Sequence, residues 1–394
     1  MAKRAHGWRR VRFGDVVRLN KETCKTPAAE GIDRYIGLEH LESDNLRVRT
    51  WGNVSDGTTF INRVRPGQVL FGKRRAYQRK VAVAEFDAIC SGDIYVFESS
   101  DPGVLLPGLL PFICQTDPFF DHAVGTSAGS LSPRTNWTSL AAYEFALPPL
   151  EEQRRICEVL SAIQAGISSV DDAREAALRC KDSCSVDVFA DNGRRLTRLS
   201  EVCDEITVGI VVKPAQWYVQ DAADSTAIPA LIMKNVQQGW LDLTELLRIS
   251  RKGHQLHEKS MLRQGDVVAV RSSGSIGRTG DAAVVPQALH GANCIDLLIA
   301  RPGRTLLPEY LCQFLNAPST RRRLVGSSSG TMQKHLNVGA FRLLEIPMRP
   351  RDEQERLVGD LDDLAVAARH CDRRREQLTG LRQTLFATLG GAAS

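Results

Sequence analysis

Short apolar runs, broken by glycine, proline and aspartate, recur along the chain and predict β-strands. In the N-terminal half we expect strands at 12–18, 35–41, 69–71, 81–85 and 94–97. In the C-terminal half we expect strands at 228–233, 266–270, 282–285 and 295–300. A short helical pattern follows each group, at 109–120 and 308–316. The fold class predicted for each half is therefore α+β.

A long helical pattern without proline follows each of these globular segments. From Leu357 to Leu385 a seam of mainly apolar residues, with Arg375 and Arg382 in it, alternates in steps of four and three, and Ile156, Ile163 and Val170 recur seven residues apart. Both patterns are heptad seams on helices of about 35 residues, or ~50 Å. One amphipathic helix packed on its own domain is the alternative. Because the seams are so long, we expect two antiparallel coiled-coil helices that separate the two halves.

The two halves also repeat one another in sequence. At an offset of 201 the matched segments are Leu105-Leu106-Pro107 with Leu306-Leu307-Pro308, 125–130 with 326–331, and 149–153 with 350–354. Earlier in each half, 64–70 aligns with 262–268 at an offset of 198. Such a period is far longer than that of a solenoid repeat, so each copy is a domain-sized unit and the chain has an internal pseudo-twofold repeat.

Composition narrows the class of protein only a little. The 394 residues are 43% hydrophobic and 25% charged, which excludes a disordered chain. No stretch approaches the ~18 apolar residues of a membrane span, so we expect a cytoplasmic protein with no membrane partner. The ten cysteines are expected to be free thiols, and Cys180 and Cys184 have no nearby histidine to complete a zinc site. A net charge of +5 does not by itself indicate nucleic-acid binding.

Motifs that would indicate catalysis are missing from the sequence. The glycine cluster at 274–280 has neither dinucleotide-binding nor Walker A spacing. No Asn/Asp-Pro-Pro-aromatic motif for a flipped adenine is present, and His254 and His257 lack a third metal ligand. We therefore predict no catalytic residue and no metal site, and a binding protein is favoured over an enzyme.

Positive charge is densest at 73–80, where five cations lie within eight residues. Arginine can bond guanine bidentately, glutamine can bond adenine, and either cation can contact phosphate. The candidate DNA-binding residues of this segment are Lys73, Arg74, Arg75, Tyr77, Arg79 and Lys80. A solvated surface loop is the alternative.

The corresponding segment of the second half, 271–278, is short, polar and glycine-rich and still holds two arginines. Polar side chains also lie between glycines at 125–136 and 326–337, and the run 321–323 suits phosphate contact. The two copies keep one framework and differ in loop chemistry, as expected of two readers of different DNA sequences. The further candidate DNA-binding residues are Arg134, Arg271, Ser273, Arg278, Gln333 and Lys334.

These residues resemble the DNA-specificity subunits of type I restriction-modification systems. The likeness lies in the entries into the long helices at 147–156 and 346–357, in the loop 265–277, and in the late loop 330–337. The chain departs from the family pattern where the basic segment 73–80 replaces a glycine-rich loop. It departs again where Ser132-Pro133-Arg134 stands against Gln333-Lys334-His335. Both departures leave open which bases are read.

The resemblance implies a non-catalytic subunit with target-recognition domains at 1–150 and 191–351 and spacer helices at 151–190 and 352–394. It would read a bipartite target in double-stranded DNA for phage defence. Two adenine-N6 methyltransferase subunits would dock on the helices, and a motor-nuclease restriction subunit would join for cleavage. S-adenosylmethionine, ATP and Mg²⁺ would be used by these partners, with no cofactor in this chain. The alternatives are a DNA-independent tandem scaffold or adaptor and the recognition subunit of a type II-like methyltransferase.

Overall fold

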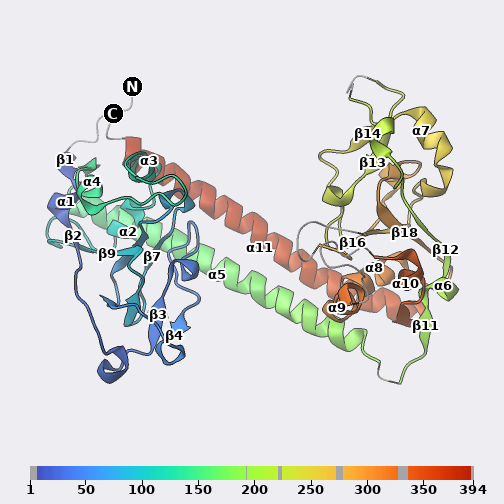
Figure 1. Cartoon of the computed structure of the whole chain (residues 1–394), viewed down its shortest axis with the longest axis horizontal. Helices are drawn as coiled ribbons and strands as arrows, with labels where there is room; N and C mark the ends of the chain where they lie inside the picture. Colours follow the sequence, from blue (N-terminus) through green and yellow to red (C-terminus); the bar gives the residue numbers. More distant parts are fainter. Residues whose placement is uncertain (1–6, 192, 221–223, 272–277, 327–335, 392–394) are drawn as a thin grey trace. The chain divides into compact units, whose positions relative to one another are not determined.

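The computed structural model describes residues 7–191, 193–220, 224–271, 278–326 and 336–391. The chain divides into two compact units, the first formed by 1–172 with 371–394 and the second by 173–370 (Figure 1). Two long helices, α5 (Leu150–Val188) and α11 (Arg351–Gly391), each contribute residues to both units. Among the described residues, no helix is both long and apolar enough to cross a membrane.

The first unit contains two four-stranded sheets. One has the order β2-β9-β6-β7, formed by Val17–Leu19, Ile94–Ser99, Val69–Gly72 and Val81–Val83. The other has the order β4-β3-β8-β5, formed by Gly52–Asn53, Arg34–Ile36, Ala88–Cys90 and Asn62–Val64. A further pair joins β1 (Arg9–Arg12) to β10 (Glu144–Leu147). The short helices are α1 (Phe13–Val16), α2 (Leu110–Ile113), α3 (Asp117–Gly125) and α4 (Trp137–Ala141).

The second unit has corresponding strands. Its four-stranded sheet has the order β12-β18-β15-β16, formed by Cys203–Val208, Leu297–Pro302, Val267–Val270 and Ala282–Val284. A three-stranded sheet has the order β14-β13-β17, formed by Leu247–Ile249, Ile228–Leu231 and Asn293–Cys294. β11 (Leu196–Arg198) pairs with β19 (Glu345–Pro347). The short helices are α6 (Leu199–Val202), α7 (Arg251–Leu256), α8 (Pro308–Asn316), α9 (Pro318–Gly326) and α10 (Val338–Arg342).

The expected strand at 12–18 is wrong, because a helical turn occupies its centre. β1 ends at Arg12, α1 follows, and β2 begins at Val17. Phe13 and Val16 are both buried. Residues three apart lie on the same face of a helix but on opposite faces of a strand, so a helical turn is the conformation that buries both.

The expected helix at 109–120 is instead two helices, α2 and α3. Thr116 lies between them in an extended conformation, with ψ of 147°. Pro118 then lies in the first turn of α3, where proline's missing N–H is not needed. In the second unit the expected helix at 308–316 is confirmed as α8, with the same bounds.

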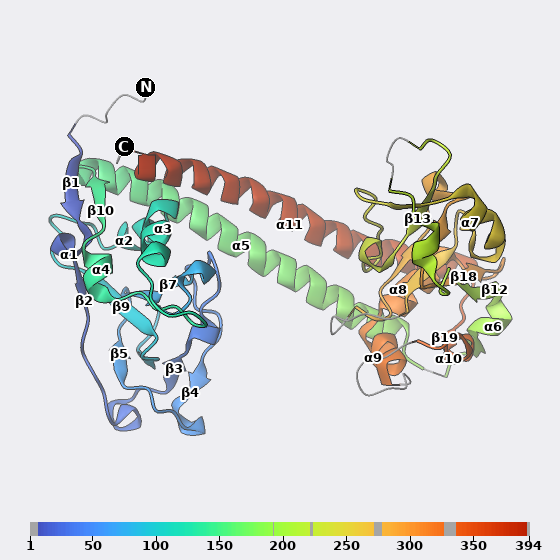
Figure 2. The ribbon, with the colours of Figure 1, turned by 45° about the horizontal axis from the view of Figure 1, so that its top comes forward.

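A buried glutamine fixes the start of each long helix to its globular part. The Gln153 side chain accepts a hydrogen bond from the Leu106 backbone N–H at 2.9 Å and donates to the Val104 and Pro148 carbonyls, each at 2.9 Å. Gln354 makes the same three bonds to Leu307, Thr305 and Arg349, again at 2.9 Å. Every partner is displaced by 201 residues, so the repeat extends to individual contacts. In Figure 2, β1 and β10 lie beside the start of α5.

Within the first unit, the end of α11 packs on the start of α5. Arg375 pairs with Asp171 at 2.9 Å, and Arg382 donates to Gln164 at 2.9 Å. Higher residue numbers of α11 thus meet lower numbers of α5, so the two helices run antiparallel in this unit. Phe386 and Leu389 of α11 belong to the unit's hydrophobic core together with Phe112 and Leu109.

Candidate nucleic-acid interface

The basic segment predicted from the sequence connects β6 to β7 at the edge of the first unit's sheet. Its middle is a single 3-10 turn, η4 (Ala76–Gln78), flanked by Arg75 and Arg79 at φ of 55° and 54°. Left-handed backbone at a non-glycine residue costs of order 1 kcal/mol and persists only where the surroundings hold it. The turn directs Tyr77 outward, with 55% of the residue exposed.

Two of the predicted DNA-binding cations are bound to the protein itself. Arg79 pairs with Asp44 at 3.0 Å and Asp117 at 2.9 Å, and it donates to the Gln115 carbonyl at 3.0 Å. Its guanidinium also lies over the Phe120 ring, 4.5 Å from the centroid. Lys80 donates to the Leu38 carbonyl at 2.6 Å. Arg79 and Lys80 therefore hold the base of the loop in place.

The late loop of the first unit closes on itself. Ala128 and Arg134 exchange two backbone hydrogen bonds, at 3.0 and 2.9 Å. Gly129 begins the tip at φ of 110°, a conformation that L side chains rarely adopt. Leu131 lies in this tip and is 90% exposed. The closed tip thus presents an apolar side chain to solvent.

The two loops predicted to contact DNA are fastened to each other. The Arg75 N–H donates to the Pro133 carbonyl at 2.7 Å, and the Thr135 N–H donates to the Lys73 carbonyl at 3.0 Å. The Ser132 hydroxyl accepts from Arg74 at 3.1 Å and from Arg75 at 3.3 Å. Residues about sixty positions apart in the sequence thereby form one surface.

Asp93, which sequence reasoning missed, lies under this surface. Its carboxylate pairs with Arg74 at 3.4 Å and with Arg134 at 3.0 Å. Its backbone carbonyl accepts from the Lys73 N–H at 3.0 Å, and the Lys73 ammonium lies 4.7 Å from the centre of the Tyr95 ring. Burial raises the pKa of Tyr95, so this phenol is neutral at physiological pH. A single aspartate directly before a strand was not distinctive in the sequence.

In the second unit, Arg271 occupies the place of Lys73. The Leu336 N–H donates to the Arg271 carbonyl at 2.8 Å, and the Arg271 guanidinium donates back to the Leu336 carbonyl at 3.3 Å. Arg271 also pairs with Asp296 at 2.8 Å. The predicted residues Ser273, Gln333 and Lys334 lie outside the described residues.

Arg278 and Arg321 share one carboxylate partner in the second unit. Arg278 pairs with the buried Asp281 at 3.3 Å and donates to the Met233 and Val236 carbonyls. Arg321, from the predicted phosphate-contacting run, also pairs with Asp281. Arg278 is therefore held by protein acceptors, as Arg79 is in the first unit.

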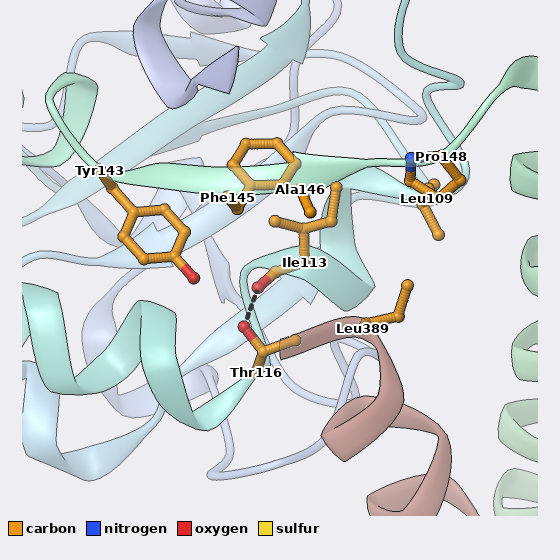
Figure 3. Close-up of a pocket in the computed structure, with 8 residues that line it drawn as sticks. All are labelled: Leu109, Ile113, Thr116, Tyr143, Phe145, Ala146, Pro148 and Leu389. Atoms are coloured by element: carbon orange, nitrogen blue, oxygen red, sulfur yellow. Dashed lines mark hydrogen bonds between the residues drawn. The ribbon is translucent and has the colours of Figure 1, made fainter. Parts of the chain in front are cut away.

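Metal-ligating side chains do not cluster in the described part of the chain. This part contains no group of three or more histidine, cysteine, aspartate or glutamate side chains placed to hold a metal. His257 bonds the Gly253 carbonyl, and His254 contacts Asn293 at 3.4 Å. Leu389, Thr116 and Ile113 are among the residues that line a cavity of about 10 Å³ (Figure 3). The Thr116 hydroxyl donates a hydrogen bond to the Ile113 carbonyl there. The cavity has room for at most one water molecule.

Comparison with known proteins identifies the class of this architecture. The family model described as "Type I restriction modification DNA specificity domain" matches residues 6–177. Residues 6–177 are therefore similar to this domain family, and the expected resemblance to type I specificity subunits is confirmed.

Particular relatives agree with this class. The EcoKI specificity subunit of Escherichia coli K12 is 25% identical over 171 residues, covering 42% of this chain and 36% of the relative. The StySPI specificity subunit of Salmonella potsdam is 26% identical over 181 residues, covering 45% and 37%. The chain therefore spans well under half of the length of these curated relatives.

A solved structure shares the fold over the whole chain. The S subunit of a type I restriction-modification system from M. genitalium superimposes with a TM-score of 0.61 at 12% identity, covering 99% of this chain and 98% of that one. The mixed α+β architecture with two long helices is thus a known fold.

Proposed function

We propose that the chain is the non-catalytic DNA-recognition subunit of a type I restriction-modification system. It reads a bipartite target in double-stranded DNA and directs adenine-N6 methylation and restriction by partner subunits in the cytoplasm. Residues 1–150 and 191–351 serve as the two target-recognition domains, and 151–190 and 352–394 serve as the spacer helices.

The observation that carries this proposal is the same loop junction in both units. The bond from the Thr135 N–H to the Lys73 carbonyl corresponds to the bond from the Leu336 N–H to the Arg271 carbonyl. The backbone contact is kept while the loops that begin at Lys73 and Arg271 differ in sequence, with five cations in 73–80 against two arginines and two glycines in 271–278. Two readers of different half-sites on one scaffold require this combination of constant framework and variable surface.

The spacer role rests on the heptad seams and on the antiparallel contacts within the first unit. A coiled coil of α5 and α11, related by a pseudo-twofold repeat, would set the separation of the two half-sites in units of a helical turn of DNA, about 34 Å. It would also present equivalent surfaces to two copies of one methyltransferase subunit. A motor-nuclease subunit would complete the system, and S-adenosylmethionine, ATP and Mg²⁺ would be bound by these partners.

Duplex binding at several salt concentrations tests DNA recognition. Affinity of the full chain, with its methyltransferase subunit, should fall steeply and linearly on a plot of log K against log salt, because phosphate contacts release counterions. Binding that is absent at every salt concentration would favour the DNA-independent scaffold. Sequencing of methylated DNA from cells that carry the system identifies the target. Methylation without any ATP-driven cleavage would favour the type II-like methyltransferase.

Shortening α11 and α5 by one heptad tests the spacer. The deletion should change the gap between the two half-sites and leave their sequences unchanged, because recognition lies in the loops and separation in the helices. The measurement is the methylated motif in cells. A motif with an unchanged gap contradicts the spacer assignment.

A further inference from the structure

One carboxylate faces the loop arginines at the same position in each unit. Asp93 directly precedes β9, and Asp296 directly precedes β18. β9 and β18 are equivalent strands, since each is the second strand of the sheet and pairs with β6 or β15 through the matched residues Val69 and Val267. The two aspartates therefore occupy one site of the repeated fold.

In these aspartate–arginine ion pairs the carboxylates are partly shielded from solvent, and the arginines remain partly exposed. The Asp93 side chain is 19% exposed, while its partners Arg74 and Arg134 are 40% and 56% exposed. The Asp296 side chain, at 39%, faces Arg271 at 27%. Each carboxylate thus accepts from one nitrogen of a partly exposed guanidinium, while Arg74 also donates to Ser132 and Arg271 to the Leu336 carbonyl. In the first unit, the Asp93 carboxylate pairs with two arginines, Arg74 and Arg134.

The physical effect of such a carboxylate differs for the two kinds of DNA contact. A phosphate is an anion, so a nearby carboxylate opposes its approach to the arginine. A base edge presents neutral acceptors in a fixed pattern, so a guanidinium held in one orientation is favoured there. The carboxylate therefore lowers sequence-independent affinity more than sequence-specific affinity.

From this geometry we propose that Asp93 and Asp296 are specificity-determining positioning residues. Each holds the arginines of its recognition loop for base contact and opposes their use as phosphate contacts on arbitrary DNA. The inference rests on the proposed DNA recognition and adds to it the residues that separate specific from nonspecific binding.

Asparagine is the informative replacement at both positions. It keeps the size of the side chain and one acceptor oxygen, and it removes the charge. Asp296 has φ of 50°, and asparagine tolerates this left-handed conformation as well as aspartate does. Asp296→Asn and Asp93→Asn therefore test the charge in two separately folded sites, so failure of one variant to fold leaves the other informative.

The test compares two duplexes bound by the full chain with its methyltransferase subunit. One carries the target found by methylation sequencing and the other is a scrambled duplex of equal length, each measured by fluorescence anisotropy across KCl concentrations. For each asparagine variant we expect three- to tenfold tighter binding of the scrambled duplex at low salt, since about one extra phosphate contact forms. The slope of log K against log salt should steepen by about one, and the ratio of specific to nonspecific affinity should fall.

Two controls separate this role from a structural one. Asp93→Glu keeps the charge and should keep the wild-type slope. Asp56→Asn removes the same formal charge from η3 (Val54–Asp56) of the first unit and should leave the ratio of affinities unchanged. Equal losses on both duplexes, or a change no larger than that of Asp56→Asn, overturn the proposal. If the wild-type chain binds neither duplex, DNA recognition itself fails.

Discussion

Replacement of Gln354 by methionine tests whether the buried glutamines hold the long helices to the globular parts. The side chain is fully buried and makes three hydrogen bonds of 2.9 Å to backbone groups. Methionine has similar length and volume but lacks a comparable donor and acceptor. At about 1 kcal/mol per hydrogen bond, the free energy of unfolding should fall by about 3 kcal/mol. For a unit of this size that lowers the midpoint of thermal unfolding by roughly 9 °C.

The assay is thermal unfolding of the full chain followed by circular dichroism. Gln153→Met removes the same three bonds in the first unit and should cost a similar amount. Gln377→Met, at an exposed position of α11, is the matched control and should change stability by less than about 0.5 kcal/mol. Gln354→Glu should be worse than methionine at neutral pH, because a carboxylate oxygen then faces two carbonyl oxygens. A Gln354→Met midpoint no lower than that of the control would refute the reasoning.

Three further predictions concern buried groups and loop cations. Gln115 and Asn316 are equivalent positions, but the Gln115 side-chain amide is buried with no partner among the described residues, whereas Asn316 makes bonds of 2.9–3.0 Å to the backbone. In urea titrations Gln115→Met should therefore be neutral or stabilising by about 1 kcal/mol, and Asn316→Leu should cost about 3 kcal/mol; equal losses would contradict this. Arg75→Ala should weaken binding of one half-site only and leave the unfolding midpoint unchanged, whereas Arg79→Ala should lower that midpoint; loss at both half-sites in binding assays would contradict the assignment. Burial raises the pKa of Cys90 from 9.0 to about 12, so the unfolded chain ionises first and stability should fall as pH rises from about 9 to about 12. Urea midpoints should fall less over that interval in Cys90→Ala, and an unchanged pH slope would contradict it.

Much of the fold follows from local patterns in the sequence. β6 begins at Val69 and α8 spans 308–316 as expected, because an apolar run bounded by glycine or a proline-led amphipathic stretch is a strong local signal. The turn at Phe13–Val16 was missed because the surrounding alternation resembles a strand. Phe13 and Val16 lie on one face because both enter the same hydrophobic core. That core is formed by residues distant in the sequence, so the local pattern could not predict it.

The contact of the two loops with DNA stays a prediction, but the structure shows how their residues are placed. The basic segment and the late loop were both identified from charge and from the repeat, and the structure brings them together at Ser132 and Pro133. Arg79 and Arg278, both predicted as DNA contacts, each bond a carboxylate and backbone carbonyls of the protein. The partner of Arg79, Asp44, lies 35 residues earlier in the chain, a separation at which sequence proximity carries no information on contact.

The sequence by itself determined the duplication, the two long helices, the loops that differ between the copies, and a family resemblance. These are properties of periodicity and of residue order, which need no knowledge of long-range contacts. Only the tertiary structure decided which cations anchor a loop and which remain accessible. It also revealed equivalent contacts within the two units. Asp93 and Asp296 each pair with a loop arginine, and Gln153 and Gln354 each bond three equivalent backbone groups. The physical reason is that hydrogen bonding and screening of a charge depend on distance in space, and folding alone sets those distances.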